Sequence, residues 1–184
     1  MVSRNRSVRR TKAALQSALV DLLLEHRNLQ AVTVQAICDR ASISRSTFYL
    51  HFENKEEVLS TYLIQMIGRV HDALRAWAGP DDSRWTVYFA HIAHIAPILS
   101  SLSDRSGSHA ILSRYERQFA VIMQDLLMPG RVNPLEPAVS YQAHYFSGGL
   151  LSLTWWWVEQ DHCVTPAQEM SRRYHALCSG QLCP

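Results

Sequence analysis

The sequence of 184 residues lacks the features that mark membrane-spanning, exported or disulfide-stabilised proteins. No apolar run approaches the roughly 20 residues that a membrane-spanning helix needs, so we expect no membrane partner. The N-terminus is basic and has no apolar signal core, from which we expect no export. The cysteines are scattered without a C-x-x-C pair, which favours reduced thiols in the cytoplasm. They are Cys38, Cys163, Cys178 and Cys183.

The short motifs of catalysis and cofactor binding are also missing. The chain has no G-x-S-x-G elbow, no P-loop and no G-x-G-x-x-G turn, so we expect no enzyme, no catalytic residue and no cofactor. His91 and His94 could hold a metal with a third ligand, but no acidic residue or cysteine follows at ligand spacing. Cys178 and Cys183 have no basic neighbour that would obviously lower a thiol pKa. We predict no metal site, and a metal- or thiol-dependent enzyme remains the less favoured alternative.

Positive charge is concentrated at the start of the chain. The net charge is only +2, but residues 1–55 hold nine Lys and Arg against four Asp and Glu, and residues 56–184 hold nine against twelve. A basic module on a mildly acidic body suggests that one end meets a polyanion; the alternative is an ordinary solvated surface. We expect residues 1–10 to be a flexible basic arm that follows a phosphate backbone or enters a minor groove, or else a solubilising tail. The charges near this end are Arg4, Arg6, Arg9, Arg10 and Lys12.

The strongest pattern is a helix-turn-helix over residues 33–52. The first helix has an apolar face made by Val34, Ile37, Cys38 and Ala41. Thr33 and Ser44 stand where N-caps are needed, on either side of the short turn Ser42-Ile43. The second helix would bury Phe48 and Phe52 and expose a side made of hydrogen-bond donors: Arg45, Ser46, Thr47, Tyr49 and His51. A helix-turn-helix presents such a side to the major groove of DNA.

Positions 33–59 read T-V-x-x-I-C-x-x-A-x-I-S-R-S-T-F-Y-x-H-F-x-N-K-E-E-V-L, which resembles the N-terminal domain of the TetR family of transcriptional regulators. The resemblance implies phosphate contacts from Thr33, Tyr49, His51 and Lys55, and base-edge contacts from the segment Arg45–Thr47. The predicted DNA-binding residues are Thr33, Ser44, Arg45, Ser46, Thr47, Tyr49, His51 and Lys55.

Two positions depart from the pattern of that family. Ser42 stands where a glycine is usual, and glycine suits a positive φ better than serine does. Leu50 stands where a polar or aromatic residue is common, although its apolar side chain would suit a thymine methyl group.

The chain as a whole predicts an all-α fold. Outside the helix-turn-helix, apolar periodicity predicts helices over residues 11–26, 54–77, 83–101, 110–128, 138–160 and 166–179. We expect Pro97 to kink or end its helix, and residues 100–107 and 131–137 to be connections. The first helix would complete a three-helix, homeodomain-like head over residues 8–68, because two short helices cannot bury their apolar sides alone. Residues 69–184 would form a second helical domain.

The second domain carries two further expectations. Residues 138–160 are apolar on almost every side, so one side should meet a second copy of the chain, and a glycine pair would allow close approach. We therefore predict a two-fold dimer built on this helix and the last one, as the resemblance also implies. The candidate interface residues are Tyr145, Gly148, Gly149, Leu151, Trp155 and Tyr174.

The resemblance also implies an effector pocket in this domain, whereas its aromatic side chains can equally be read as plain core. A pocket with few polar groups would favour an apolar or aromatic small molecule. The candidate lining residues are Met66, Tyr88, His91, Tyr115, Met123, Tyr145 and Trp156.

Together these features predict a cytoplasmic, homodimeric, DNA-binding regulator. We expect a repressor that binds an inverted-repeat operator in double-stranded DNA and leaves it when a small molecule binds. The alternative from another class is a helical adaptor that binds proteins and keeps the helix-turn-helix only as a scaffold. Such an adaptor would show no salt-sensitive binding to duplex DNA.

Overall fold

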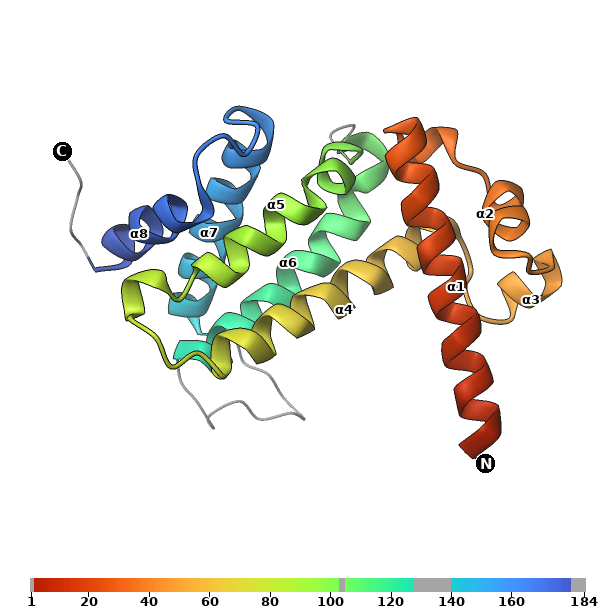
Figure 1. Ribbon diagram of the computed structural model, residues 1–184, viewed down its shortest axis with the longest axis horizontal. Coiled ribbons are helices and arrows are strands. Elements are labelled where there is room, and N and C mark those ends of the chain that lie inside the picture. The colour runs from red at the N-terminus through yellow and green to blue at the C-terminus, as the bar shows by residue number, and fades with distance from the viewer. Residues whose placement is uncertain (1, 103–104, 128–139, 180–184) are drawn as a thin grey trace. The chain divides into compact units, whose positions relative to one another are not determined.

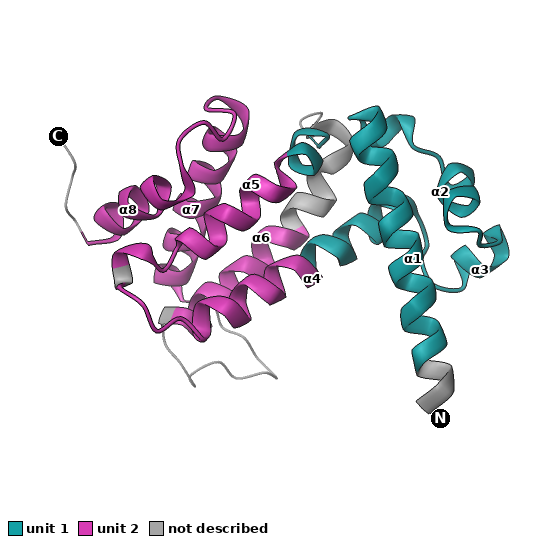
Figure 2. Ribbon diagram, viewed as in Figure 1, with its two compact units in different colours: residues 1–64, 97–112 teal, residues 65–96, 113–184 magenta. Residues whose placement is uncertain are grey.

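A computed structural model describes residues 2–102, 105–127 and 140–179 of the chain. Every regular element in this part is a helix and none is a strand, which confirms the all-α prediction (Figure 1). The chain forms two compact units (Figure 2). The first unit comprises residues 1–64 and 97–112, and the second comprises residues 65–96 and 113–184. No helix in the described residues is both long enough and apolar enough to cross a membrane.

The first unit packs helices of very different length around an aromatic and aliphatic core. Its elements are α1 (Val2–His26), the 3-10 helix η1 (Leu29–Ala31), α2 (Val34–Ala41), α3 (Arg45–Tyr49) and the first part of α4 (Lys55–Arg75), together with residues 97–112. α1 packs against α2. The core comprises Leu15, Leu19, Leu23, Ile37, Phe48, Phe52, Leu59 and Leu63. The predicted burial of Ile37, Phe48 and Phe52 is therefore confirmed, and Ile43 is partly buried.

Two expectations about this unit were wrong. The segment 1–10 was predicted as a flexible arm, but residues 2–10 belong to α1, which begins at Val2. The segment before Thr11 contains neither proline nor glycine, and its arginines favour helix, so nothing in it stops the helix. The second helix of the helix-turn-helix ends at Tyr49, and Phe52 lies in the turn beyond it while remaining buried.

The predicted caps and turn are present in the structure. Thr33 Oγ1 accepts a hydrogen bond from the Ala36 N–H at 3.1 Å, and Ser44 Oγ accepts from the Thr47 N–H at 3.2 Å. Asn54 Oδ1 accepts from the Glu57 N–H at 2.8 Å at the start of α4. Ser42 adopts φ 54° and ψ 42°, the left-handed conformation for which glycine is better suited.

Lys55, the first residue of α4, holds the segment around η1 in place. Its Nζ donates hydrogen bonds to the carbonyl oxygens of Leu29 at 2.9 Å, Gln30 at 3.4 Å and Val32 at 2.7 Å. An ammonium group has three hydrogens and no acceptor, so these three carbonyls use its whole capacity. Lys55 therefore connects the first residue of α4 to the linker between α1 and α2.

The second unit contains the rest of α4, together with η2 (Asp81–Ser83), α7 (Tyr141–Glu159) and α8 (Ala167–Cys178), and most of α5 (Thr86–Ser100) and α6 (Arg105–Leu127). α5 continues through Pro97 to Ser100, so of the two expected effects of this proline the helix end is not found. Two helix predictions need correction. α6 begins at Arg105, inside the predicted loop 100–107. Pro166 is the N-cap of α8 rather than its first residue. The predicted connection 131–137 lies outside the described residues.

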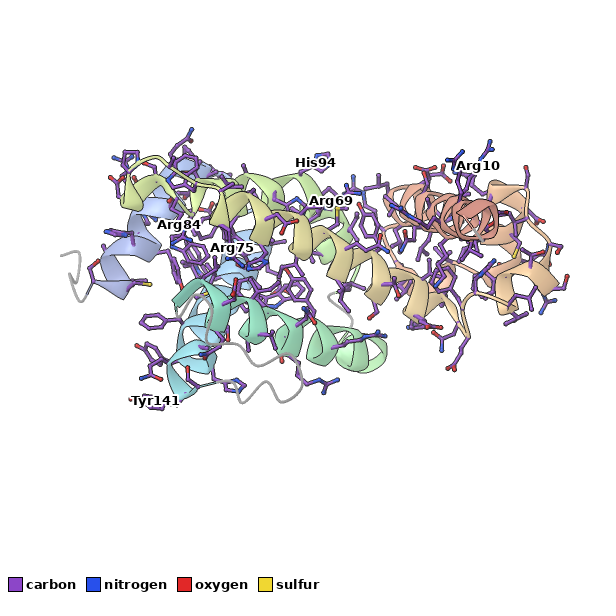
Figure 3. All side chains as sticks on the ribbon, turned by 90° about the horizontal axis from the view of Figure 1, so that it is seen from below. Arg10, Arg69, Arg75, Arg84, His94 and Tyr141 are labelled. Carbon is purple, nitrogen blue, oxygen red and sulfur yellow. The ribbon has the colours of Figure 1, made fainter. Side chains whose placement is uncertain are left out.

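Polar side chains connect the helices of this unit. Asp125 on α6 accepts hydrogen bonds from α4, from His71 at 2.8 Å and from Arg75 at 3.0 Å, and Figure 3 labels Arg75. Tyr88 on α5 and Thr154 on α7 form a buried hydroxyl pair at 2.8 Å. The Tyr88 hydroxyl must donate in this pair, because Thr154 donates its own hydrogen to the Leu150 carbonyl.

We predict that Lys55→Met will destabilise the first unit. The substitution keeps most of the apolar stem but leaves the part-buried Val32 carbonyl without its donor, and the Leu29 carbonyl keeps only its bond from the Val32 N–H. The expected loss in free energy of unfolding is about 2 kcal/mol. Urea denaturation followed by far-UV circular dichroism measures it. Arg69→Met is the matched control, because it removes a positive charge from an exposed position of the same helix. Equal stability of the two variants would show that the Lys55 bonds contribute nothing.

Candidate nucleic-acid interface

One side of α3 is open to solvent and carries four neighbouring side chains. Arg45, Ser46, Tyr49 and Leu50 are all exposed, Tyr49 by 51% and Leu50 by 79%. Their spacing of i, i+1, i+4 and i+5 places them on one side of a helix. We call these four residues the α3 face. The opposite side of α3 carries Phe48, which is fully buried and contacts Phe52 and Tyr49.

The positively charged side chain of the α3 face lies over a neighbouring aromatic ring. The Arg45 guanidinium carbon lies 6.0 Å from the centre of the Tyr49 ring, one helical turn further on. A guanidinium over an aromatic ring is weakly attracted to it, which limits the directions that the arginine samples. Arg45 thus presents planar donors beside an exposed tyrosine.

The hydroxyl groups at the start of α3 form a small network. Ser44 Oγ lies 2.9 Å from both Ser46 Oγ and Thr47 Oγ1, and it accepts from the Thr47 backbone as well. Ser44 therefore acts mainly as the N-cap of α3. The hydroxyl groups of Ser46 and Thr47 are already engaged with Ser44, so they have less freedom than the sequence suggested.

Seven of the predicted DNA contacts lie on α3, at the N-caps of α2 and α3, and in the turn after α3. Thr33, Ser44, Arg45, Ser46 and Tyr49 are exposed, and Thr47 and His51 are partly buried. Lys55 does not join them as a free charge, because its ammonium is bonded to three carbonyls. Its predicted phosphate contact is incompatible with this geometry unless those bonds are exchanged.

Other basic side chains in the first unit differ in availability. Arg6, Arg9 and Arg10 are exposed on α1, and Figure 3 shows Arg10 projecting from that helix. Arg40 on α2 instead pairs with Glu25 through two hydrogen bonds of 2.8 Å. That pair raises the pKa of Arg40 and lowers the pKa of Glu25. The sequence analysis missed this pair, because the two residues are fifteen positions apart.

The effector candidates of the second unit fall into two groups. Tyr88 and Met123 are buried, and Met66, His91 and Tyr115 are partly buried. Tyr145 and Trp156 are exposed, by 76% and 44%, and so do not belong to this buried group.

His91 has an unusual environment. Its Nε2 atom is buried and has no hydrogen-bond partner among the described residues. Burial lowers the pKa of His91, and the nearby positive charges of His94 and Arg69 lower it further. The neutral ring therefore offers one unused hydrogen-bonding atom inside the second unit.

The dimer candidates also separate by exposure. Tyr145, Gly148 and Gly149 are exposed and Trp155 is partly buried. Leu151 and Tyr174 are buried within the chain, where the Tyr174 hydroxyl donates to the Phe146 carbonyl at 3.2 Å. Their predicted place at an interface between copies was wrong, because the helices of their own unit already cover them.

The exposed side of α7 forms one continuous stripe. Its members lie at i, i+4, i+7, i+8, i+11 and i+15: Tyr141, Tyr145, Gly148, Gly149, Ser152 and Trp156. Figure 3 shows Tyr141 at the outer end of the helix. A Cβ atom built on Gly148 or Gly149 meets nothing within 4 Å, so the middle of the stripe is unfilled. We call these six residues the α7 stripe.

Thiol and metal chemistry find little support in the described part of the chain. Burial raises the pKa values of Cys38, Cys163 and Cys178, which disfavours the reactive thiolate. No group of three or more His, Cys, Asp or Glu side chains in the described residues could hold a metal ion. Cys183 lies outside the described residues.

Comparison with known sequences identifies the N-terminal part of the chain. The family model for bacterial regulatory proteins of the tetR family matches residues 22–61. The HTH-type transcriptional regulator YxbF of Bacillus subtilis is 34% identical over 105 residues, which are 57% of this chain and 27% of that protein. The HTH-type transcriptional regulator EthR of Mycobacterium tuberculosis is 39% identical over 61 residues, which are 33% of this chain and 28% of that protein. The matches thus span little more than a quarter of each of these relatives.

Solved structures extend the likeness to nearly the whole chain. A TetR-family regulator from Syntrophomonas wolfei has a TM-score of 0.69 at 18% identity and covers 94% of this chain and 96% of its own. FadR from Thermus thermophilus, a TetR-family repressor solved with lauroyl-CoA, has a TM-score of 0.59 at 19% identity with the same coverage. At these identities the likeness concerns the fold. Residues 22–61 of the chain therefore form an N-terminal domain of the tetR family of bacterial regulatory proteins, and the chain as a whole has the fold of TetR-family regulators.

Proposed function

We propose that this protein is a sequence-specific DNA-binding regulator that acts in the cytoplasm as a homodimer. The observation that carries the proposal is the α3 face, which presents a guanidinium, a hydroxyl and a tyrosine to solvent from the second helix of a helix-turn-helix. Arginine and serine are common partners of base edges and phosphates. The exposed arginines of α1 add positive charge to the same unit.

An enzyme and a protein-binding adaptor are the two alternative functional classes, and both fit the chain less well. TetR-family members are regulators and not enzymes, which removes the thiol- or metal-dependent enzyme from consideration. A protein-binding adaptor would have no use for a donor-rich, acid-free face on α3. It would also show no salt-sensitive binding to duplex DNA, because such binding comes from contacts to phosphates.

We favour repression, in which the bound dimer blocks transcription. One solved neighbour is named as an operon activator, DhaS, with a TM-score of 0.61 at 16% identity. A reporter gene behind the selected operator separates the two outcomes, because deleting the regulator raises expression for a repressor and lowers it for an activator.

We predict that Arg45→Ala will weaken and relax DNA recognition. The operator is first selected from a random-sequence duplex library with the unaltered protein, and we expect an inverted repeat. Affinity for that operator should fall about 5- to 150-fold, with the base preference lost at one position of each half-site. Fluorescence anisotropy over a salt series measures the affinity. Arg69→Ala, at an exposed position of α4, is the control and should bind normally. Failure to enrich any duplex sequence would refute sequence-specific binding.

The α7 stripe supports the homodimer. Exposed tyrosine and tryptophan side chains in one continuous stripe leave apolar surface that a second copy can bury. The two glycines in its centre would let a partner helix approach closely. A two-fold dimer would also place two α3 faces on one DNA duplex, at a spacing set by the helical repeat.

We predict that Gly149→Arg will produce a monomer. Sedimentation should give twice the 21.0 kDa chain mass for the unaltered protein and the single mass for the variant. Gly68→Arg is the matched control, because Gly68 also lies in a helix and its added Cβ also meets nothing within 4 Å. The control should remain dimeric. A monomeric unaltered protein would exclude the dimer. A dimeric Gly149→Arg would place the interface away from the α7 stripe.

An apolar small molecule that binds the second unit would regulate the protein. The unpartnered Nε2 atom of His91, with the mostly apolar side chains around α5, suits a ligand with one hydrogen-bonding group on an apolar body. The Thermus thermophilus neighbour was solved with lauroyl-CoA, so a long acyl chain is a reasonable first probe. α4 contributes residues to both units, and a ligand that prefers one position of α4 would change DNA affinity by that preference alone.

We predict that a long-chain acyl ligand will stabilise the protein and lower its affinity for the operator. Lauroyl-CoA, laurate and coenzyme A are compared by thermal shift and by operator anisotropy. The two acyl compounds should raise the Tm and coenzyme A alone should not. His91→Leu should weaken binding about tenfold by removing the polar partner, whereas His94→Leu, exposed on the same helix, should not. No shift with either acyl compound would exclude this ligand class.

A further inference from the structure

Among the residues of the first unit whose burial is described, Leu50 is the most exposed large apolar residue. It lies 79% exposed directly beside Tyr49 and is the only side chain of the α3 face without a polar group. Isolated surface leucines are common and by themselves mean little. The position of this one is specific, because it extends the face that we propose to enter the major groove.

The backbone of Leu50 fixes where its side chain emerges. Leu50 is the C-cap of α3 and keeps helical angles, φ −73° and ψ −18°, and its N–H bonds to the Ser46 carbonyl at 3.2 Å. It therefore stands one turn beyond Ser46, on the same side. It lies five positions after Arg45, a rise of about 7.5 Å along a helix axis. For a helix that lies along the groove, at about 3.4 Å per base pair, this rise corresponds to bases about two pairs apart.

The major groove offers one apolar feature to such a side chain. Base edges there carry hydrogen-bond donors and acceptors, and the 5-methyl group of thymine is the exception. A leucine cannot pair with a donor or acceptor and would leave it desolvated. Against a methyl group it instead removes apolar surface from water on both sides.

We propose that Leu50 reads a thymine through its 5-methyl group, about two base pairs from the base that Arg45 contacts in each half-site. This inference rests on the proposed function and refines it by naming the base and the group recognised. In a two-fold dimer the thymine occurs twice, at symmetric positions of the operator.

The test removes the 5-methyl group of thymine from the DNA without changing any hydrogen-bonding group of the base. Each thymine of the selected operator is replaced in turn by deoxyuridine, and Kd is measured by anisotropy. We expect a loss of about fourfold per half-site at one symmetric pair of positions, and a larger loss when both are replaced. Replacements elsewhere in the operator should leave Kd unchanged.

Leu50→Ala should bind the thymine and deoxyuridine operators equally, while Arg45→Ala keeps the preference for the methyl group. Because Leu50 is exposed, both variants should melt as the unaltered protein does, which circular dichroism checks. A thermal melt that differs for Leu50→Ala would instead mark the side chain as part of the fold and overturn the assignment.

The outcomes separate this inference from the function it rests on. Operator binding with no deoxyuridine effect, or an effect that persists in Leu50→Ala, overturns the role of Leu50 and leaves the DNA-binding proposal intact. A selected operator that lacks thymine at the symmetric positions would also overturn the role of Leu50 and leave the DNA-binding proposal intact. Absence of any selected sequence overturns both.

Discussion

The proposed recognition element of this protein, α3, is a helix of five residues, and such a helix cannot persist by its own hydrogen bonds. Isolated helices shorter than about 12 residues are marginal in water, because nucleation is unfavourable. α3 therefore depends on what holds it from outside. Phe48 anchors it in the core with no exposed surface, and Ser44 caps its first turn. These two contacts fix which side of the helix faces solvent, and so they fix the α3 face.

Lys55 contributes to this outside support of α3 through its bonds to the linker between α1 and α2. The linker between α1 and α2 carries backbone carbonyls that no regular ladder satisfies, and an unpaired buried carbonyl is costly. The ammonium of Lys55 supplies three donors at that point. In the sequence, a lysine beside a helix-turn-helix is most simply read as a phosphate contact. In the structure it stabilises the unit that carries α3, so its loss should affect DNA binding through folding.

Local signals in the sequence were the ones that predicted structure correctly. The caps at Thr33 and Ser44 and the left-handed Ser42 depend only on neighbouring residues, and all three are found. The errors arose where long-range packing decides. Arg40 pairs with Glu25 from another helix, and Leu151 and Tyr174 are covered by elements distant in sequence. Apolar periodicity showed that α7 is buried on several sides, but not which side remains open.

The exposed apolar residues of the two units have different physical meanings. On α7 they are aromatic and continuous, with glycines between them, and a contiguous patch of that kind is best covered by a large partner surface. On α3 a single leucine stands among polar neighbours, where a protein partner would have to desolvate Arg45 to reach it. A DNA groove does not impose that loss, because it supplies acceptors for the arginine beside a methyl group for the leucine. The polar surroundings of Leu50 therefore favour a nucleic acid over a protein at this face.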